Sequence, residues 1–211
     1  MTNSPTGHSL DPALHPAGGL TLLERVTAAV APRADARVAT VVKVAVGVLL
    51  LAVLAQVRVQ IGPVPITGQT LGVLLLGAAY GLPLGLASVG TYLVLGALGA
   101  PLFAGGASGL AYLAGPTGGY LVGFVLAVAL LGHLSRRGWD RGVVSCCLML
   151  IAANLVIYLP GVLWLKQTLG TSWGATLAAG VTPFLVGDAV KVAIAVVALP
   201  GAWLLLGSSR R

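Results

Sequence analysis

Six apolar runs, separated by short polar or basic segments, dominate this sequence and restrict the folds open to it. Hydrophobic residues make up 57% of the chain and charged residues only 8%, whereas soluble domains carry about 25% charged residues. Backbone groups in lipid must be bonded within their own segment, so such runs favour an all-α integral membrane protein. The expected runs are Val38–Val57, Thr70–Tyr80, Pro83–Leu98, Tyr120–Leu134, Gly142–Trp164 and Thr182–Leu206.

The second and third runs are shorter than the others. Thr70–Tyr80 and Pro83–Leu98 each fall short of the roughly 20 residues that a straight spanning helix needs. Two interpretations are open: they are separate tilted helices, or they are the arms of one bent hairpin. We expect six transmembrane helices, with five as the alternative.

The basic residues indicate how these helices are oriented. Cytoplasmic segments of membrane proteins are enriched in Lys and Arg. With six helices, one side of the membrane receives Arg25, Arg33, Arg37, Lys43, Arg136, Arg137, Arg141, Arg210 and Arg211. Only Arg58 and Lys166 lie near the opposite face. We therefore expect a multi-pass protein of the cell membrane with both termini inside, and we attribute the net charge of +7 to orientation rather than to nucleic-acid binding.

The chain divides into a polar tail and a membrane domain. Residues 1–37 are rich in Pro, Gly, Ser, Asp and His, and we expect a largely disordered cytoplasmic tail. Leu20–Val30 has the pattern of one short amphipathic helix within it. No signal-peptide pattern precedes the first long apolar run. Residues 38–207 form the predicted six-helix transmembrane domain.

A charged pair, Asp188 and Lys191, interrupts the last apolar run. Charges in hydrocarbon cost several kcal/mol by most estimates, so they usually face a partner, a cavity or a ligand. Residues three apart share one face of a helix. Counted from Pro183 at about 1.5 Å per residue, Asp188 lies roughly 8 Å and Lys191 roughly 12 Å into the outer half of the membrane. Two readings are open: an internal salt bridge that staples the last helix to the bundle, or a clamp for a small polar ligand.

Polar residues also collect where the second apolar run begins. In the segment Gln60–Thr70, two prolines favour an extended outer loop, and Thr67, Gln69 and Thr70 follow it. The threonines are candidates for helix capping. Gln69 at the mouth of a membrane pocket is the functional alternative.

The connection between the third and fourth helices is unusually rich in glycine. Gly99–Gly119 is too apolar for a surface linker, and we expect a loop on the outer side that either packs on itself or approaches a ligand. Tyr120 at its end offers a ring and a hydroxyl. Asn154 and Tyr158, four apart in the fifth run, share a helix face, and Asn154 bonds either a neighbouring helix or a ligand.

Several functional classes find no support in the sequence. There is no Walker lysine loop, no Gly-x-Ser-x-Gly and no His-Glu-x-x-His, so a membrane enzyme is disfavoured. The histidines are scattered, and Cys146 and Cys147 are expected to be packing residues, so we expect no metal site. A small oligomeric channel, using the Gly119–Gly123 or Gly81–Gly85 spacing as a packing seam, remains a weaker alternative.

Four ordered motifs lie along the chain: Pro63–Thr70, Phe103–Gly109, Gly115–Tyr120 and Pro183–Lys191. Together they resemble the motifs of the BioY family, the biotin-specific substrate-binding subunits (S-components) of energy-coupling factor (ECF) transporters. The resemblance runs from Val38 to Leu206. It implies six transmembrane helices and high-affinity capture of biotin from outside, with biotin as the transported ligand rather than a cofactor. It also implies partners: a transmembrane coupling subunit and two ATPases that energise uptake.

The resemblance further implies a set of ligand groups. Matched by position, these are Asp188, Lys191, Asn154, Tyr120 and the backbone of Gly105 and Gly106. The ureido N–H groups of biotin suit Asp188, while either its ureido oxygen or its tail carboxylate suits Lys191. Apolar walls are expected from Tyr120, Phe103 and Trp164. The remaining candidates, from the motifs above, are Thr67, Gln69 and Tyr158.

One feature departs from the family pattern. An Ala-x-x-x-Ala face for docking on the coupling subunit is absent from the first helix, and Gly47, Ala52 and Ala55 are the small residues that remain for close docking. A solitary, homo-oligomeric biotin transporter therefore stays open as an alternative. Independently of this feature, an S-component for another vitamin is the second alternative.

Overall fold

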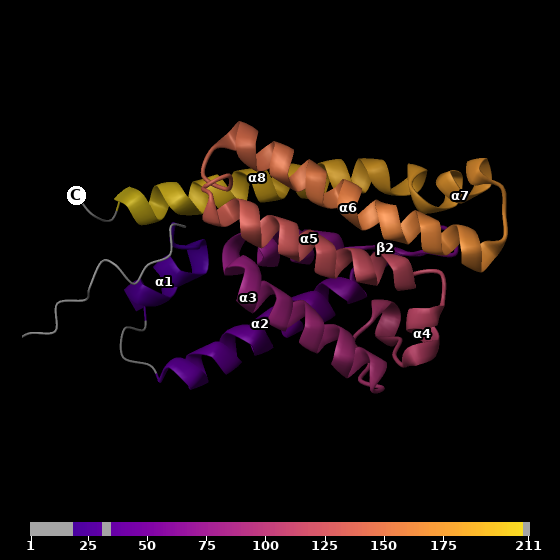
Figure 1. Ribbon diagram of the computed structural model, residues 1–211, viewed down its shortest axis with the longest axis horizontal. Helices are drawn as coiled ribbons and strands as arrows, with labels where there is room; N and C mark the ends of the chain where they lie inside the picture. The colour runs from indigo at the N-terminus through magenta and orange to yellow at the C-terminus, as the bar shows by residue number, and fades with distance from the viewer. Residues whose placement is uncertain (1–18, 31–34, 209–211) are drawn as a thin grey trace, which may run out of the picture.

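The chain folds as a bundle of long helices, shown in Figure 1. The computed structural model describes residues 19–30 and 35–208. Its elements are α1 Leu22–Val30, α2 Ala36–Gln56, β1 Arg58–Val59, β2 Ile66–Thr67, α3 Gln69–Ala97, η2 Ala104–Gly106, α4 Leu110–Ala114, α5 Gly118–Arg136, α6 Val143–Leu169, α7 Trp173–Gly180, η3 Thr182–Phe184 and α8 Leu185–Ser208. The prediction of a mostly helical membrane protein is confirmed.

Five helical stretches in the described residues are long and apolar enough to cross a bilayer. They are Ala36–Gln56, Gln69–Ala97, Gly118–Arg136, Val143–Leu169 and Trp173–Leu206. Each covers all or nearly all of one predicted apolar run, except Gln69–Ala97, which covers both short ones in this way.

The two short runs are the arms of one bent hairpin. At Gly81 the backbone leaves the helical conformation, with φ 72° and ψ 179°, a region that favours glycine. The side-chain amide of Gln69 donates a 2.8 Å hydrogen bond to the hydroxyl of Tyr92. In a straight helix these residues would be about 34 Å apart, at 1.5 Å per residue. The second arm of α3 therefore folds back along the first, which confirms the hairpin interpretation.

Close helix contacts through glycine hold the centre of the bundle together. A Cβ atom on Gly123 of α5 would lie 2.7 Å from the Ile157 carbonyl oxygen of α6, and one on Gly119 would lie 2.3 Å from the Pro160 carbonyl oxygen. Gly85 faces Val128 of α5 in the same way. The glycine spacings considered as seams for an oligomeric channel are thus filled inside one chain.

The first long helix, α2, is the least covered of the candidate spans. Valines and leucines such as Val41, Leu49 and Val53 are exposed along it. Its small residues face α3 instead: a Cβ on Gly47 would lie 2.6 Å from the Ser88 hydroxyl, and Ala55 is fully buried. Ala52 packs against the core as well. Gly47 and Ala55 are thus buried within the chain and are not open to a partner, whereas Ala52 is partly exposed.

Polar contacts join the end of the molecule where α1 and the last turns of α8 lie. Figure 1 shows α1 and the end of α8 together, opposite α4 and α7. Thr21 and Glu24 form a reciprocal cap at the start of α1, with Thr21 N–H donating to Glu24 at 2.8 Å. The indole of Trp203 donates to Asp140 at 2.6 Å, and the guanidinium of Arg141 lies 4.6 Å from the Trp203 ring centre. Burial raises the pKa of Asp140.

The short helix expected in the tail is present as α1, which contacts α3 and α8. This part of the predicted tail is therefore ordered, and α2 already begins at Ala36. The remainder of the predicted tail, residues 1–18 and 31–34, lies outside the described residues.

The glycine-rich connection folds into η2 and α4 and is anchored by an aromatic cluster. Phe103 is fully buried, with its ring centre 5.5 Å from that of Tyr92 and 5.0 Å from that of Tyr112. Gly96 leaves room for this ring, since a Cβ there would lie 2.2 Å from it. The connection therefore packs as a structured segment against the second arm of α3.

Gly123→Ala should lower the thermal stability of the detergent-purified protein. The added methyl group meets the Ile157 backbone, and overpacking of this kind costs about 1–3 kcal/mol. Gly90→Ala in α3 is the matched control, because nothing lies within 4 Å of its added Cβ. Equal melting temperatures for the two variants would contradict the close α5–α6 contact.

Candidate functional site

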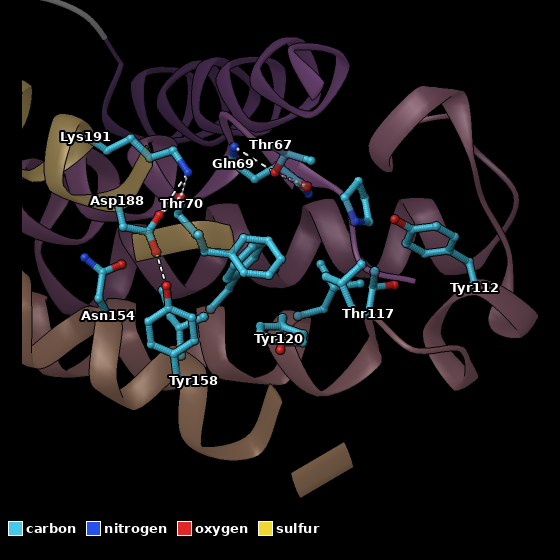
Figure 2. A pocket seen from close by; sticks show the side chains of 16 residues that line it. Thr67, Gln69, Thr70, Tyr112, Thr117, Tyr120, Asn154, Tyr158, Asp188 and Lys191 are labelled. Atoms are coloured by element: carbon cyan, nitrogen blue, oxygen red, sulfur yellow. Dashed lines mark hydrogen bonds and ion pairs between the residues drawn. The ribbon is translucent and has the colours of Figure 1, made fainter. Parts of the chain in front are cut away.

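A cavity lies among the helices around the charged pair. Its lining side chains come from the β1–β2 segment, from α3, α4, α5, α6 and α8, and from η3 (Figure 2). They are Val64, Pro65, Thr67, Gln69, Thr70, Tyr112, Thr117, Tyr120, Leu121, Phe124, Asn154, Ile157, Tyr158, Phe184, Asp188 and Lys191. We call this space the central cavity. Asp188 and Lys191 stand toward one end of it in Figure 2, and Tyr112 and Thr117 toward the other.

The charged pair forms the predicted salt bridge. Lys191 Nζ lies 3.0 Å from Asp188 Oδ1, and the two side chains are only 12% and 11% exposed. Both residues belong to α8, so the pair by itself does not tie this helix to the bundle. The salt-bridge interpretation is therefore correct for the pair, and the link between this helix and the bundle depends on further groups that bond the pair.

Two hydroxyl groups make the connection to other helices. Thr70 of α3 accepts a 2.7 Å hydrogen bond from Lys191 Nζ and donates to Asp188 Oδ1 at 3.4 Å. Tyr158 of α6 donates to Asp188 Oδ2. Both carboxylate oxygens thus accept hydrogen bonds, which offsets part of the cost of burying the charge. Sequence reasoning left Thr70 out of the site, although it stands beside Gln69 in the same motif.

Asn154 differs from its neighbours because its side-chain amide has no hydrogen-bond partner among the described residues. The residue is 8% exposed and lines the central cavity. Of the two roles considered, bonding a neighbouring helix is not seen. Because Asn154 lines the cavity and no group of the described residues bonds its amide, the amide is available to a ligand. An apolar groove between α6 and α8 reaches Asn154, Tyr158 and Asp188 from the side.

Thr67 and Gln69 line the cavity, but their polar groups form hydrogen bonds with other groups of the protein. The Thr67 hydroxyl donates to Gln69 Oε1 at 2.9 Å and accepts from the Gln69 N–H at 3.2 Å. The Gln69 amide in turn donates to Tyr92, whose hydroxyl donates to the Leu102 carbonyl at 3.0 Å. Thr67 therefore satisfies a backbone N–H at the start of α3, as the capping reading proposed. The network holds the two arms of the hairpin together.

The ring of Tyr120 forms part of the wall of the central cavity. Its hydroxyl donates a 2.7 Å hydrogen bond to the Gly180 carbonyl, and its ring centre lies 6.2 Å from that of Phe184. The hydroxyl is therefore committed to α7, while the ring is free to line the cavity together with Phe124 and Leu121. Apolar walls with a few polar groups at the ends are usual in small-molecule sites.

Four predicted site residues do not line the central cavity. Phe103 is enclosed by the aromatic cluster, and Trp164 is 41% exposed and donates to the Gly115 carbonyl at 3.0 Å. Gly105 lies against the guanidinium of Arg58, and nothing lies within 4 Å of the Cβ position of Gly106. The glycine-rich connection reaches the cavity through Tyr112 and Thr117 instead, which the sequence analysis missed because neither is marked by charge or by its position in an apolar run.

The site offers recognition groups rather than a reactive centre. Carboxylate, ammonium, amide and hydroxyl groups stand at one end of an aromatic-walled space. Within the described ranges, no three His, Cys, Asp or Glu residues come close enough to hold a metal ion. The arrangement suits a small molecule that carries both hydrogen-bond donors and acceptors.

Comparisons with known proteins show what the chain is similar to. The BioY family model matches residues 26–208. A probable biotin transporter BioY from Pyrococcus horikoshii is 44% identical over 154 residues, which cover 73% of this chain and 90% of the relative. Biotin transporter BioY from Rhizobium etli is 33% identical over 167 residues, covering 76% and 88%. The crystal structure of the S-component for biotin from an ECF-type ABC transporter superposes with a TM-score of 0.69 at 25% identity, covering 78% of this chain and 90% of that one.

Lys191→Met should destabilise the protein because it leaves the Asp188 carboxylate without its counter-charge. Breaking a buried ion pair on one side costs about 3–5 kcal/mol. Adding Asp188→Asn to this variant should recover much of that loss. Thermal unfolding in detergent measures both effects.

Lys166→Met is the matched control, since this lysine lies over the exposed Trp173 ring, 5.7 Å from its centre. A Lys191→Met protein that melts like the Lys166→Met protein would show that the pair carries no buried charge.

Proposed function

The chain belongs to the BioY family, and we propose that it is the biotin-binding S-component of a membrane uptake transporter. Its relatives are biotin transporters, and the solved structure it matches is an S-component for biotin. It is a transporter component and not an enzyme, and it is a multi-pass membrane protein. We place it in the cell membrane.

The observation that carries the proposal is the polar cluster at one end of the central cavity. Biotin has a ureido group with two N–H donors and one oxygen acceptor. The Asp188 carboxylate is the natural acceptor for the N–H groups, with the Tyr158 hydroxyl exchanging partners as biotin enters. Lys191 and the unpartnered amide of Asn154 are the donors available to the ureido oxygen. Charge-assisted hydrogen bonds of this kind are about twice as strong as neutral ones.

The walls of the cavity suit the apolar part of biotin. Tyr120, Phe124 and Phe184 supply aromatic surface for the fused rings, and burial of apolar area contributes about 25 cal/mol per Å². Thr67, Gln69 and Thr70 hold the start of α3 in place beside the charged pair. We expect these three to act mainly by positioning.

We further propose six membrane crossings with both termini inside the cell. Each arm of α3 makes one crossing, which turns five helical stretches into six spans. The orientation is supported by the basic residues that meet at one end: the Gly19 N–H donates to the Arg136 carbonyl at 3.1 Å, and Arg141 lies over Trp203. The glycine-rich connection and the central cavity then belong to the outer half.

Uptake driven by ATP requires other subunits, because no Walker lysine loop is present in this chain. We propose a transmembrane coupling subunit with two ATPases. The exposed apolar side of α2 is available for docking, and it offers Val41, Leu49 and Val53 rather than small residues. A solitary, oligomeric transporter is the alternative.

The detergent-purified chain should bind biotin with high affinity and one-to-one stoichiometry by isothermal titration calorimetry. Asp188→Asn and Lys191→Ala each remove a hydrogen bond to a charged group, worth about 1.5–3 kcal/mol, so each should weaken binding about 10- to 150-fold.

Thr168→Val is the control, because its hydroxyl bonds the Trp164 carbonyl away from the cavity. A panel of other vitamins should give no comparable heat. Absence of heat with biotin for the wild-type chain would refute the proposal, and tight binding of another vitamin would identify the alternative ligand.

Coupled uptake can be tested in cells that lack their own biotin transport. Co-expression with a coupling subunit and two ATPases should raise uptake of labelled biotin well above that of the chain alone, and an ATPase variant that cannot hydrolyse ATP should abolish the increase. Equal uptake by the chain alone would support the solitary transporter and contradict coupling.

A further inference from the structure

A second cavity adjoins the central cavity at the end away from the charged pair. The two cavities share Pro65, Tyr112 and Thr117. In Figure 2, Tyr112 and Thr117 lie on the far side of the central cavity from Asp188 and Lys191. The remaining residues of this adjoining cavity are Arg58, Gln60, Pro63, Ala104, Ala111, Gly115 and Pro116. A ligand with its ring system at Asp188 would therefore direct its tail toward Arg58.

The charges of the central cavity leave an anionic ligand without a counter-charge. Asp188 is the one acidic residue on its lining, and it is already paired with Lys191 at 3.0 Å. Glu24 and Asp140 lie at the opposite end of the molecule, with α1 and Trp203. The carboxyl group of biotin is ionised at neutral pH, because such groups have pKa values near 4. The Asp188–Lys191 pair is neutral overall, so bound biotin brings one negative charge that needs a counter-charge.

Arg58 is the cation placed to balance it. It is exposed, and within the described residues it forms no ion pair. It opposes Thr67 in the β1–β2 ribbon, and directly opposed residues point to the same face of a sheet. Thr67 lines the central cavity and Arg58 lines the adjoining one, so this shared face runs along both. Lys166, the other cation at this end, lies over Trp173 and lines neither cavity.

Gly105 explains how the Arg58 side chain is held there. A Cβ on Gly105 would lie 2.3 Å from the guanidinium carbon, and the backbone at Gly105 has φ 72°. The guanidinium therefore rests on a backbone that only glycine leaves uncovered. This is a different use of Gly105 from the ligand contact that the sequence predicted.

We propose that Arg58 binds the carboxylate of the transported ligand, and that Lys191 serves the ureido end only. The inference rests on the proposed function and adds a specificity determinant to it. A guanidinium presents two parallel N–H donors to a carboxylate, which a single ammonium does not. The side chain is partly in water, so we expect a modest contribution to affinity, about tenfold, and a dependence on salt.

The test compares biotin with biotin amide, in which a neutral carboxamide replaces the carboxylate. Wild-type protein, Arg58→Gln and Lys166→Gln are titrated with both ligands in detergent. We expect the wild type and Lys166→Gln to bind biotin about tenfold more tightly than the amide. Arg58→Gln should bind biotin only as tightly as the amide, with its affinity for the amide unchanged. Arg58→Lys should recover part of the preference.

Other outcomes would overturn the inference. If Arg58→Gln keeps the full preference for biotin, or weakens both ligands equally, Arg58 does not bind the carboxylate. If Lys191→Ala removes the preference while Arg58→Gln keeps it, the carboxylate belongs to Lys191. A wild-type chain that binds neither ligand refutes the proposed function itself, and this inference with it.

Discussion

The buried carboxylate of Asp188 and the buried ammonium of Lys191, one turn apart in α8, require hydrogen-bond partners from other helices of the bundle. In a low-dielectric interior neither charge is tolerated alone, and the pair needs hydrogen bonds to its remaining polar positions. Thr70 of α3 and Tyr158 of α6 supply them. The pair thus requires two other helices to stand at fixed places beside α8, and the space left between them is the central cavity.

The hairpin in α3 helps to hold Thr70 at that position. In a straight helix of 29 residues the second arm would point away from the first. The break at Gly81 folds the second arm back, and the Thr67–Gln69–Tyr92 network locks the arms together. The same network joins the glycine-rich connection through the Leu102 carbonyl. One chain of hydrogen bonds therefore links the start of α3, its return arm and the loop that closes the cavity.

The role of each residue in the site follows from whether its polar groups are already bonded to other groups of the protein. Gln69 and Tyr120 lie in the cavity, yet their amide and hydroxyl hold protein neighbours, so they shape it. Asn154 has an unbonded amide among the described residues, and Arg58 has no ion pair there. Asn154 lines the central cavity and Arg58 lines the adjoining one, and the two cavities share Pro65, Tyr112 and Thr117. Such an arrangement favours an elongated ligand that is polar at both ends and apolar in the middle.

Much of the fold was predictable, because hydropathy and helix length depend on local sequence alone. The runs now seen as α2, α5, α6 and α8 were placed to within a few residues. The bent hairpin was one of two readings, since no local signal tells a tilted helix from a folded arm. Thr70 was seen in its motif but left out of the site. Its role depends on a residue more than a hundred positions away in the chain, which the contact with Lys191 reveals.

By itself, the sequence determined that this is a helical membrane protein with a charged pair in its last span, because hydrocarbon excludes charge and unbonded backbone. Its motifs also determined the family. Only the tertiary structure decided which residues meet: that Phe103 and Trp164 pack outside the cavity, and that Gly105 supports Arg58. The reason is physical. The role of a side chain depends on which neighbouring groups contact it or bond its polar atoms. Those neighbours come from distant parts of the chain.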